Sequence, residues 1–359
     1  MENLVNEAFW RGRKVLVTGH TGFKGGWLCL WLQGMGARVS GYALPPPTRP
    51  SLFAAADVAR DMVSLTGDIR DAAGLEAALA GQCPEIVFHL AAQALVRPSY
   101  EDPSGTYATN VMGTVNLLEA VRRTPGVRAV VNVTSDKCYE NREWLWPYRE
   151  NEALGGRDPY SSSKACAELI TASWRDSYLA EAGCALASVR AGNVIGGGDW
   201  ARDRLVPDIM NAIVAGQPLA IRHPDAIRPW QHVLEPLQGY LLLAEKLWSE
   251  GAGYAEAWNF GPSMDDMRPV SWLAERLVSL RGGGIEIALD SGRQPHEAGI
   301  LKLDSSKART RLGWRGRLGL ERTLEWVAHW YAAHAAGQDM RHFSLEQIAR
   351  FASLGRETS

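Results

Sequence analysis

The chain has 359 residues, of which 46% are hydrophobic and 22% charged, and its formal net charge is −2. This is the composition of a globular protein with room for one large domain or two lobes, and it argues against a disordered chain. The near-neutral charge argues against a polybasic surface for nucleic acid or a membrane. We therefore expect partners of another kind, with neither nucleic acid nor a membrane among them.

Five scattered cysteines form no Cys-x-x-Cys pair, which argues against a disulfide framework and against a zinc site. No grouping of His, Cys and Asp has metal-ligand spacing, so we expect no metal. The sequence has no run of 18 or more apolar residues, and its first residues lack the apolar core of a signal peptide. These features predict a cytoplasmic protein with reduced thiols.

Short β-branched runs alternate with helical stretches over the first 195 residues. The apolar runs predict strands at 14–19, 38–44, 62–68, 85–91, 128–135 and 185–196, and helices at 25–36, 113–123 and 161–183. The strands are nearly continuous in apolar residues, as strands buried on both faces are. The pattern predicts an α/β fold: a Rossmann-type, doubly wound parallel sheet with helices on both faces.

This rhythm breaks after Gly196, where loops rich in Gly, Pro, Asp, Arg and Trp interrupt helices at 235–248 and 272–281. We expect a smaller C-terminal substrate-binding lobe over the carboxyl edge of the sheet, where open α/β sheets bind ligands. The predicted division is a dinucleotide-binding domain of residues 1–192, to which 229–260 return, a lobe of residues 193–228 and 261–335, and a C-terminal helix and tail at 336–359.

Gly19, Gly22 and Gly25 are spaced three apart between the first strand and the first helix. A pyrophosphate needs such a loop, because the backbone must turn tightly and approach the phosphates at a helix N-terminus. The alternative is a turn with a purely structural role. The position of the loop at the head of a strand–helix series favours a dinucleotide site.

The end of the second predicted strand has no Asp or Glu, although a carboxylate there usually binds the ribose of NAD. NADP therefore stays open as an alternative, with Arg49 as a candidate partner for its 2′-phosphate. Asp68 and Ile69 follow the third strand and are candidate adenine contacts. Asp68 could equally be a helix cap or a turn residue.

Tyr160 and Lys164 lie four residues apart at the start of a predicted helix, so both project from one face. A lysine ammonium beside a phenol lowers the pKa of the phenol, and the phenolate can accept a proton from a substrate hydroxyl. A Tyr-x-x-x-Lys spacing also occurs by chance on protein surfaces. Its place after a dinucleotide loop and the fifth strand favours a catalytic pair.

The stretches TGHTGFKG, HLAAQALVRPS, NVMGTVNLLEA, PYSSSK and RAGNVIGGGD resemble the extended short-chain dehydrogenase/reductase family over most of the chain. The resemblance implies a bound NAD, Tyr160 as base, Lys164 holding the phenol and the nicotinamide ribose, and a nucleotide-sugar substrate in the smaller lobe. The implied cofactor contacts, besides Asp68, Ile69, Tyr160 and Lys164, are Gly19, Thr21, Gly22, Phe23, Lys24, Gly25, Leu90, Ala91, Ala92, Gln93 and Asn110.

Ser135, Asp136 and Lys137 follow the buried strand at 128–135 without a spacer. An epimerase needs the hydroxyl here but neither an acid nor an amine. A 4,6-dehydratase needs both, because one group protonates the leaving O6 of the hexose and another accepts the C5 proton. Asp136 suits the acid, and Lys137 suits the acceptor if burial and neighbouring cations lower its pKa. The alternative is an ordinary salt bridge at a strand end.

The Asp–Lys pair resembles the CDP-glucose branch of the nucleotide-sugar 4,6-dehydratases, whereas the dTDP-glucose branch carries Asp–Glu. That resemblance implies NAD-dependent conversion of CDP-D-glucose to CDP-4-keto-6-deoxy-D-glucose, by oxidation at C4, loss of water across C5–C6 and return of the hydride to C6. Three alternatives stay open: an epimerase, a dehydratase of a dTDP-, GDP- or UDP-hexose, and a silent nucleotide-sugar-binding protein.

Asparagine and arginine side chains of the second lobe suit a sugar diphosphate, because a guanidinium pairs with phosphate through two hydrogen bonds. The family resemblance also implies a homodimer or homotetramer, with the helices at 104–123 and 160–182 pairing across a twofold axis, and Leu169 and Ile170 fit that interface or internal packing equally. The substrate-binding candidates are Ser135, Asn193, Arg202, Arg204, Leu205, Arg228, Trp230, Arg293, His296 and Glu297.

Overall fold

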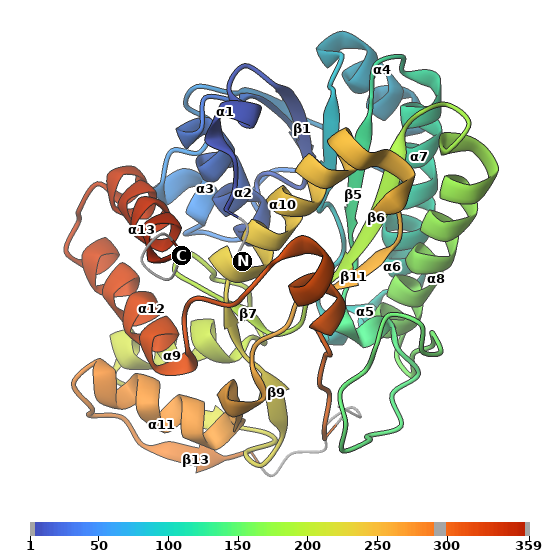
Figure 1. The fold of residues 1–359 in the computed structure, drawn as a ribbon. Coiled ribbons are helices and arrows are strands. Elements are labelled where there is room, and N and C mark those ends of the chain that lie inside the picture. The colour runs from blue at the N-terminus through green and yellow to red at the C-terminus, as the bar shows by residue number, and fades with distance from the viewer. Residues whose placement is uncertain (1–3, 291–298, 356–359) are drawn as a thin grey trace.

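The structure is a computed structural model and describes residues 4–290 and 299–355. Its centre is a seven-stranded sheet in the order β11-β6-β5-β4-β1-β2-β3, with every pairing parallel (Figure 1). This order confirms the predicted doubly wound α/β fold. The strands are β1 (Lys14–Thr18), β2 (Arg38–Ala43), β3 (Val63–Thr66), β4 (Ile86–His89), β5 (Ala129–Val133), β6 (Ala185–Arg190) and β11 (Ala257–Asn259).

Helices cover both faces of this sheet, because successive side chains of a buried strand point to opposite sides. On β1, Val15 and Val17 pack into the core with α2 (Phe23–Gly34) and α10 (Leu234–Glu250). Leu16 packs on the other face with α4 (Ala72–Gln82) and α7 (Gly113–Arg123), beside which lies α8 (Pro159–Trp174). Shorter helices are α1 (Glu7–Trp10), α3 (Leu52–Ala55), α5 (Val96–Glu101) and α6 (Pro103–Tyr107), and a π-helical segment, Ala108–Met112, joins α6 to α7.

A smaller lobe lies beyond the carboxyl ends of the strands, at the bottom of Figure 1. Two-stranded pairs β8–β13, β9–β12 and β7–β10 hold it together. Its strands and helices are β7 (Val194–Ile195), α9 (Leu205–Ala215), β8 (Leu219–Ile221), β9 (Ile227–Pro229), β10 (Gln231–His232), β12 (Met267–Pro269), α11 (Val270–Leu280) and β13 (Ile287–Leu289).

The C-terminal part of the chain returns to the first domain. After α12 (Leu320–Ala335), helix α13 (Met340–Leu354) packs on α2, with the rings of Trp31 and Phe351 edge-to-face at 5.7 Å. Over 4–290 and 299–355 no helix combines the length and apolar character needed to cross a bilayer. All five cysteines are free thiols.

Two predicted elements differ from the structure. The strand expected over 185–196 is divided in the structure: β6 ends at Arg190 and β7 begins at Val194, after Asn193, whose φ of 44° is left-handed. The helix expected over 161–183 begins earlier, at Pro159, where the Asp158 carboxylate accepts a hydrogen bond from the backbone N–H of Ser161. It passes into a π-helical turn, Arg175–Leu179, after Trp174.

Candidate active site

A single cavity of about 1190 Å³ lies at the carboxyl ends of the strands, between the sheet and the smaller lobe. Pockets for one small molecule measure roughly 300–1,000 Å³. This cavity is therefore large enough for two ligands side by side. Its walls include the glycine loop, the residues after β4 and β5, the start of α8, and loops of the smaller lobe.

The glycine loop leaves no room for a side chain at Gly19 or at Gly25. Gly19 has a φ of 77°, and a Cβ built on it would lie 2.6 Å from the backbone nitrogen of Ala91. A Cβ on Gly25 would lie 2.2 Å from the carbonyl oxygen of Gly19. Helix α2 begins directly after Gly22, without a side-chain cap, so its first N–H groups suit an anion. These residues fit a dinucleotide pyrophosphate.

The adenosine end of the cavity has an arginine at its edge and no carboxylate from β2. Residues 43–45 and 47–49 line the cavity, and Arg49 is the charged residue among them. Asp68 also lines it, and its carboxylate accepts hydrogen bonds from Arg70 Nε and Nη2 at 2.9 and 2.5 Å, which lower the pKa of Asp68. The cap of α4 is Asp71, so Asp68 does not have that role.

Tyr160 and Lys164 lie one turn apart on α8, both buried and both on the cavity wall. Lys164 Nζ donates a hydrogen bond to the carbonyl of Val133 at 3.3 Å, and burial lowers the pKa of Lys164 to about 8. The expected lowering of the phenol pKa is not found here. Burial raises the pKa of Tyr160 to about 12, because it disfavours the phenolate more than the hydrogen bond with Ser135 favours it.

Ser135, Asp136 and Lys137 form a tight turn at the end of β5 and all line the cavity. Ser135 Oγ accepts a hydrogen bond from the backbone N–H of Lys137 at 3.2 Å and donates one to Asp136 Oδ1 at 3.1 Å. The carboxyl group of Asp136 is 2% exposed, and burial raises its pKa. No ion pair between Asp136 and Lys137 occurs in the part of the chain that the structure describes. A buried carboxyl with a raised pKa suits a general acid.

Gly192 explains why the chain can pass so close to this carboxyl. A Cβ on Gly192 would lie 1.8 Å from Asp136 Oδ2. That oxygen has no hydrogen-bond partner in the described chain. Gly192 therefore covers this oxygen, and any side chain at position 192 would displace the carboxyl group or the loop.

Lys24, predicted only as a cofactor contact, is a half-buried amine that lies near Lys164 and Arg204. It lines the cavity, and its Nζ lies 5.8 Å from the ring centroid of Tyr240. Burial lowers the pKa of Lys24 to about 7, and the nearby charges of Arg204 and Lys164 lower it further. The sequence signal was a charged residue among apolar ones in the first turn of α2.

The other predicted cofactor contacts divide into two groups. Residues 90–93 line the cavity, as do Thr21 and Phe23 of the glycine loop and Ile69 after β3. Asn110 lies behind this wall, where it holds the backbone of Gln93 by two hydrogen bonds of 2.9 Å and donates to Ser163 Oγ. Asn110 therefore supports the wall and is not part of it.

The structure brings seven of the predicted substrate residues to the cavity: Ser135, Asn193, Arg202, Arg204, Leu205, Arg228 and Trp230. Arg204 pairs with Asp199 at 2.8 Å, and Arg228 donates hydrogen bonds to the carbonyls of Ile227 and Gly299 at 3.1 Å. The indole of Trp230 donates to the carbonyl of Arg268 at 3.1 Å. Arg293, His296 and Glu297 lie outside the described residues.

Sequence reasoning missed an ion-pair group at the mouth of the cavity. Asp203, in the smaller lobe, forms ion pairs with Arg222 at 3.1 Å and with Arg97 of α5 at 3.3 Å. Charged side chains from both sides of the cavity therefore meet at Asp203. Arg97 lies on a short helix and the other two residues lie in loops, and nothing in their spacing indicates that they meet.

A doubly wound sheet, a glycine loop without room for a side chain at Gly19 or Gly25 and a buried tyrosine–lysine pair together define an extended short-chain dehydrogenase/reductase. The sequence profile of the GDP-mannose 4,6-dehydratase family matches residues 16–326, and the chain belongs to that family.

Individual relatives agree with this assignment. A CDP-glucose 4,6-dehydratase of Salmonella typhimurium is 54% identical over 98% of this chain and 99% of that protein. A dTDP-glucose 4,6-dehydratase of Xanthomonas campestris is 25% identical over 88% of this chain and 92% of its own length.

The fold also matches solved structures. The dTDP-glucose 4,6-dehydratase DesIV of Streptomyces venezuelae, with NAD bound, has a TM-score of 0.76 and 24% identity over 90% of this chain and 98% of that one. A UDP-glucose 4-epimerase of Thermotoga maritima has a TM-score of 0.79 and 23% identity over 89% and 99%.

Proposed function

We propose that this chain converts CDP-D-glucose to CDP-4-keto-6-deoxy-D-glucose with NAD as a recycled cofactor. The observation that carries the proposal is the 54% identity, over nearly the whole of both chains, with the CDP-glucose 4,6-dehydratase of Salmonella typhimurium. The turn at Ser135–Lys137 supports it from the structure, since it adds a buried acid and an amine to the tyrosine–lysine pair. An epimerase has no use for either group.

Tyr160 and Ser135 act at the first step. Both line the same wall of the cavity, and in the proposed mechanism Ser135 hydrogen-bonds the C4 hydroxyl while Tyr160 accepts its proton. Lys164, on the next turn of α8, stabilises the phenolate that this transfer requires. NAD, when bound, accepts the hydride from C4 and later returns it to C6.

Asp136 and Lys137 act at the second step. The C4 ketone makes the C5 hydrogen acidic, so water can leave across C5–C6. Asp136, which lines the cavity, protonates the leaving O6, and Lys137, directly after it in the turn that follows β5, accepts the C5 proton. Hydride return to C6 leaves an enolate, which takes its C5 proton back from Lys137, and the proton taken up by Tyr160 replaces the one that Asp136 gave to O6. The net change is then the loss of one water molecule.

The cofactor assignment rests on the glycine loop and on NAD-bound neighbours of the same fold. The missing carboxylate after β2 and the position of Arg49 at the cavity edge leave room for a 2′-phosphate, so NADP is the direct competitor to test. We expect trace NAD to support many turnovers, because the hydride returns to the sugar.

The test is incubation of the protein with CDP-, dTDP-, GDP- and UDP-glucose, each with substoichiometric NAD or NADP, followed by NMR of the sugar. A C6 methyl signal with CDP-glucose and NAD supports the proposal. A C4 epimer without loss of water would identify an epimerase, and a methyl signal with another nucleotide would identify another dehydratase. Binding without any turnover would identify a silent binding protein.

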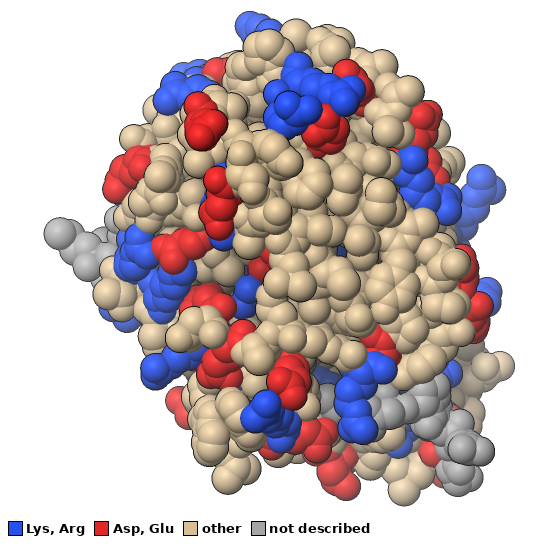
Figure 2. Space-filling view, turned by 90° about the vertical axis from the view of Figure 1, so that its right-hand side faces the viewer, with Lys and Arg blue, Asp and Glu red and all other residues tan. Residues whose placement is uncertain are grey.

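We propose further that the chain forms a homodimer through the face of α7 and α8. Figure 2 shows this side of the molecule, where the middle is uncharged and the Lys, Arg, Asp and Glu side chains gather around it. Exposed large apolar residues on α6, α8 and the segments that follow them are Tyr107, Met112, Leu169 and Tyr178. Of the two residues predicted for this role, Leu169 is 60% exposed, whereas Ile170 packs into the core beneath.

A further inference from the structure

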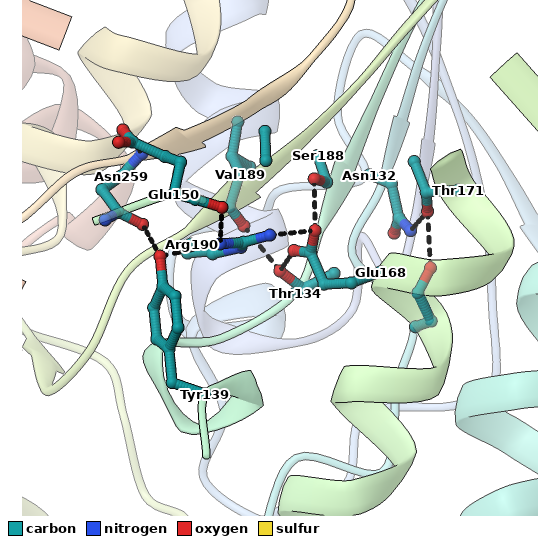
Figure 3. Close-up of polar contacts among 12 residues, drawn as sticks. Asn132, Thr134, Tyr139, Glu150, Glu168, Thr171, Ser188, Val189, Arg190 and Asn259 are labelled. Carbon is teal, nitrogen blue, oxygen red and sulfur yellow. Dashed lines mark hydrogen bonds and ion pairs between the residues drawn. The ribbon is translucent and has the colours of Figure 1, made fainter. Parts of the chain in front are cut away.

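A buried ion pair, Glu168–Arg190, joins α8 to β6 (Figure 3). Glu168 stands on α8 one turn beyond Lys164, and Arg190 is the last residue of β6. Arg190 Nη2 and Glu168 Oε2 are 2.8 Å apart, and both side chains are 3% exposed. Apolar residues of the same volume commonly stabilise a fold as well as a buried ion pair does, or better. The stability of the fold alone therefore does not explain this pair.

The Glu168 carboxylate holds the chain just before the catalytic turn. It accepts hydrogen bonds from Thr134 Oγ1 and, at 2.6 Å, from Ser188 Oγ, in addition to the pair with Arg190. Thr134 directly precedes Ser135, and its backbone N–H donates to the carbonyl of Val189 at 2.9 Å. The position of Thr134 is thus fixed from α8 and from β6 together.

Arg190 holds the chain just after the same turn. Its Nη1 donates to the Tyr139 hydroxyl at 2.7 Å and to the carbonyl of Glu150 at 3.1 Å. The Tyr139 hydroxyl donates in turn to Asn259 Oδ1 at 2.8 Å (Figure 3). Tyr139 directly follows Cys138, the last residue of the turn. One ion pair therefore clamps the turn on both sides, at Thr134 and at Tyr139.

Glu168 also sets the charge around Lys164. Its negative charge raises the pKa of Lys164 against the larger opposite effect of burial. The titratable groups that face Lys164 from other elements are His89 of β4, Cys138 of the turn and Lys24 of α2. Burial lowers the pKa of His89 to about 3 and raises that of Cys138, so both are neutral near pH 7. The positive charge of Lys24 disfavours the ammonium form of Lys164, so Glu168 is the member of this set that favours it.

We infer that Glu168 and Arg190 are positioning residues of this active site, which clamp the turn that carries Ser135 and Asp136 and keep Lys164 in its ammonium form. The inference rests on the proposed function, which assigns the catalytic roles to that turn and to Lys164.

Glu168→Gln tests the charge, because it keeps the shape of the side chain. Removing a nearby anion lowers the pKa of a lysine, so the alkaline limb of the rate of nicotinamide reduction should move down by about one pH unit. At pH 8, which equals the starting pKa of Lys164 of about 8, that corresponds to a roughly fivefold fall in kcat, with KM little changed. Glu168→Gln alone leaves the Arg190 guanidinium buried without its carboxylate. The double variant Glu168→Gln/Arg190→Met removes that guanidinium as well, and its alkaline limb should stay at the lowered pH.

Thr134→Val tests the clamp, because it removes the hydroxyl that joins the turn to Glu168 and leaves every charge in place. It should lower kcat about tenfold without moving the alkaline limb. Thr171→Val is the matched control: Thr171 lies on the same side of α8 and accepts a hydrogen bond from Asn132 of β5 at 2.7 Å, but does not touch the turn. Its kcat and pH profile should equal those of the unsubstituted protein.

A measurement independent of turnover uses the seven lysines of the chain. In protein labelled with ¹³Cε-lysine, the Lys164 signal is identified by its absence in Lys164→Met and is followed through a pH titration. Its midpoint should fall in Glu168→Gln and in the double variant. An unchanged midpoint in both, or a full kcat in Thr134→Val, would overturn the inference. If the unsubstituted protein turned over no nucleotide sugar, the proposed function would fail, and the lysine titration would still decide the role of Glu168.

Discussion

Asp136 is a carboxyl group enclosed by the turn, by Gly192 and by the cavity, with one oxygen that meets no donor. A carboxyl group in water is ionised at neutral pH, whereas burial disfavours the ionised form. Burial therefore raises the pKa of Asp136, although the charges of Lys137, Arg228 and Lys24 oppose this effect.

Replacing Asp136 by Asn or Lys137 by Met should leave the first hydride transfer intact and suppress the loss of water. One positioned acid or base typically contributes ~10²–10⁴-fold to a rate, so the defect should be large and confined to the second step. Reduced nicotinamide should accumulate on the enzyme, visible by absorbance, with little deoxysugar. Tyr160→Phe should block reduction itself. Near-normal turnover in both turn variants would mean that neither group serves the elimination.

The raised pKa of Asp136 predicts a pH dependence of the second step. The acid is available below that pKa and is lost as pH rises through it, so elimination should slow on the alkaline side. The ratio of reduced to oxidised cofactor during turnover should therefore rise with pH. Asp136→Asn cannot ionise, and the same ratio in that variant should not show this rise. A flat ratio in the unsubstituted protein would assign the acid to another group.

Gly192→Ala should displace the carboxyl group of Asp136, although Gly192 is not itself one of the proposed catalytic residues. Its Cβ would overlap Asp136 Oδ2, so the turn or the loop must move, and a shift of about 1 Å can cost on the order of 10²-fold in rate. Gly81→Ala is the control, because a Cβ there meets nothing within 4 Å. The product rate should fall in the first variant alone, with both proteins folded by circular dichroism. Equal rates would show that the loop yields without moving Asp136.

At the scale of elements, α8 lines the active site with one side and faces outward with the other. Tyr160, Lys164 and Glu168 recur every four residues and lie along the buried side, while Leu169 faces outward. The strands β1 to β5 and this stripe of α8 were predictable, because apolar runs and fourfold spacing are local. The Glu168–Arg190 pair was not, since its residues are 22 apart and meet only when α8 packs on β6. For the same reason we did not predict the close approach of Gly192 to Asp136. The end of β6 before the left-handed Asn193 was also not predicted.

The pair between α8 and β6 predicts a stability difference. Arg190→Met leaves the Glu168 carboxylate buried and unpaired, which typically costs about 3–5 kcal/mol of the free energy of unfolding. Arg149→Met breaks an ion pair with Asp304 in which the arginine is 71% exposed, and should cost about 0–1 kcal/mol. Chemical denaturation of both variants measures the contrast. Equal midpoints for the two variants would mean that Glu168 takes a proton or another partner without cost.

At the scale of the molecule, the exposed apolar face of α8 predicts the assembly. Leu169→Glu puts a charge into the middle of the proposed interface and should convert a dimer to a monomer by light scattering at micromolar concentration. Val214→Glu, on α9 in the smaller lobe, changes an equally apolar and more exposed position, and should leave the mass unchanged. A monomeric mass for the unsubstituted protein would contradict the dimer.

The cavity draws its walls from residues 19 to 270, so the site depends on the tertiary fold of almost the whole chain. Its dinucleotide half comes from the first 164 residues, and its other half comes from loops that follow β6. No shorter segment contains both halves, and a fragment ending near residue 200 would retain the glycine loop and the tyrosine–lysine pair without the arginines of the smaller lobe.

The parallel pairing of β11 with β6 has a consequence for the order in which the protein is made. β6 is complete at Arg190, but the strand that covers its outer edge begins only at Ala257. Until those later residues leave the ribosome, β6 presents an open row of backbone N–H and C=O groups, which is a template for pairing with other chains. Synthesis that stops between residues 190 and 257 should therefore yield aggregating products, and a chaperone would be needed longest over this interval.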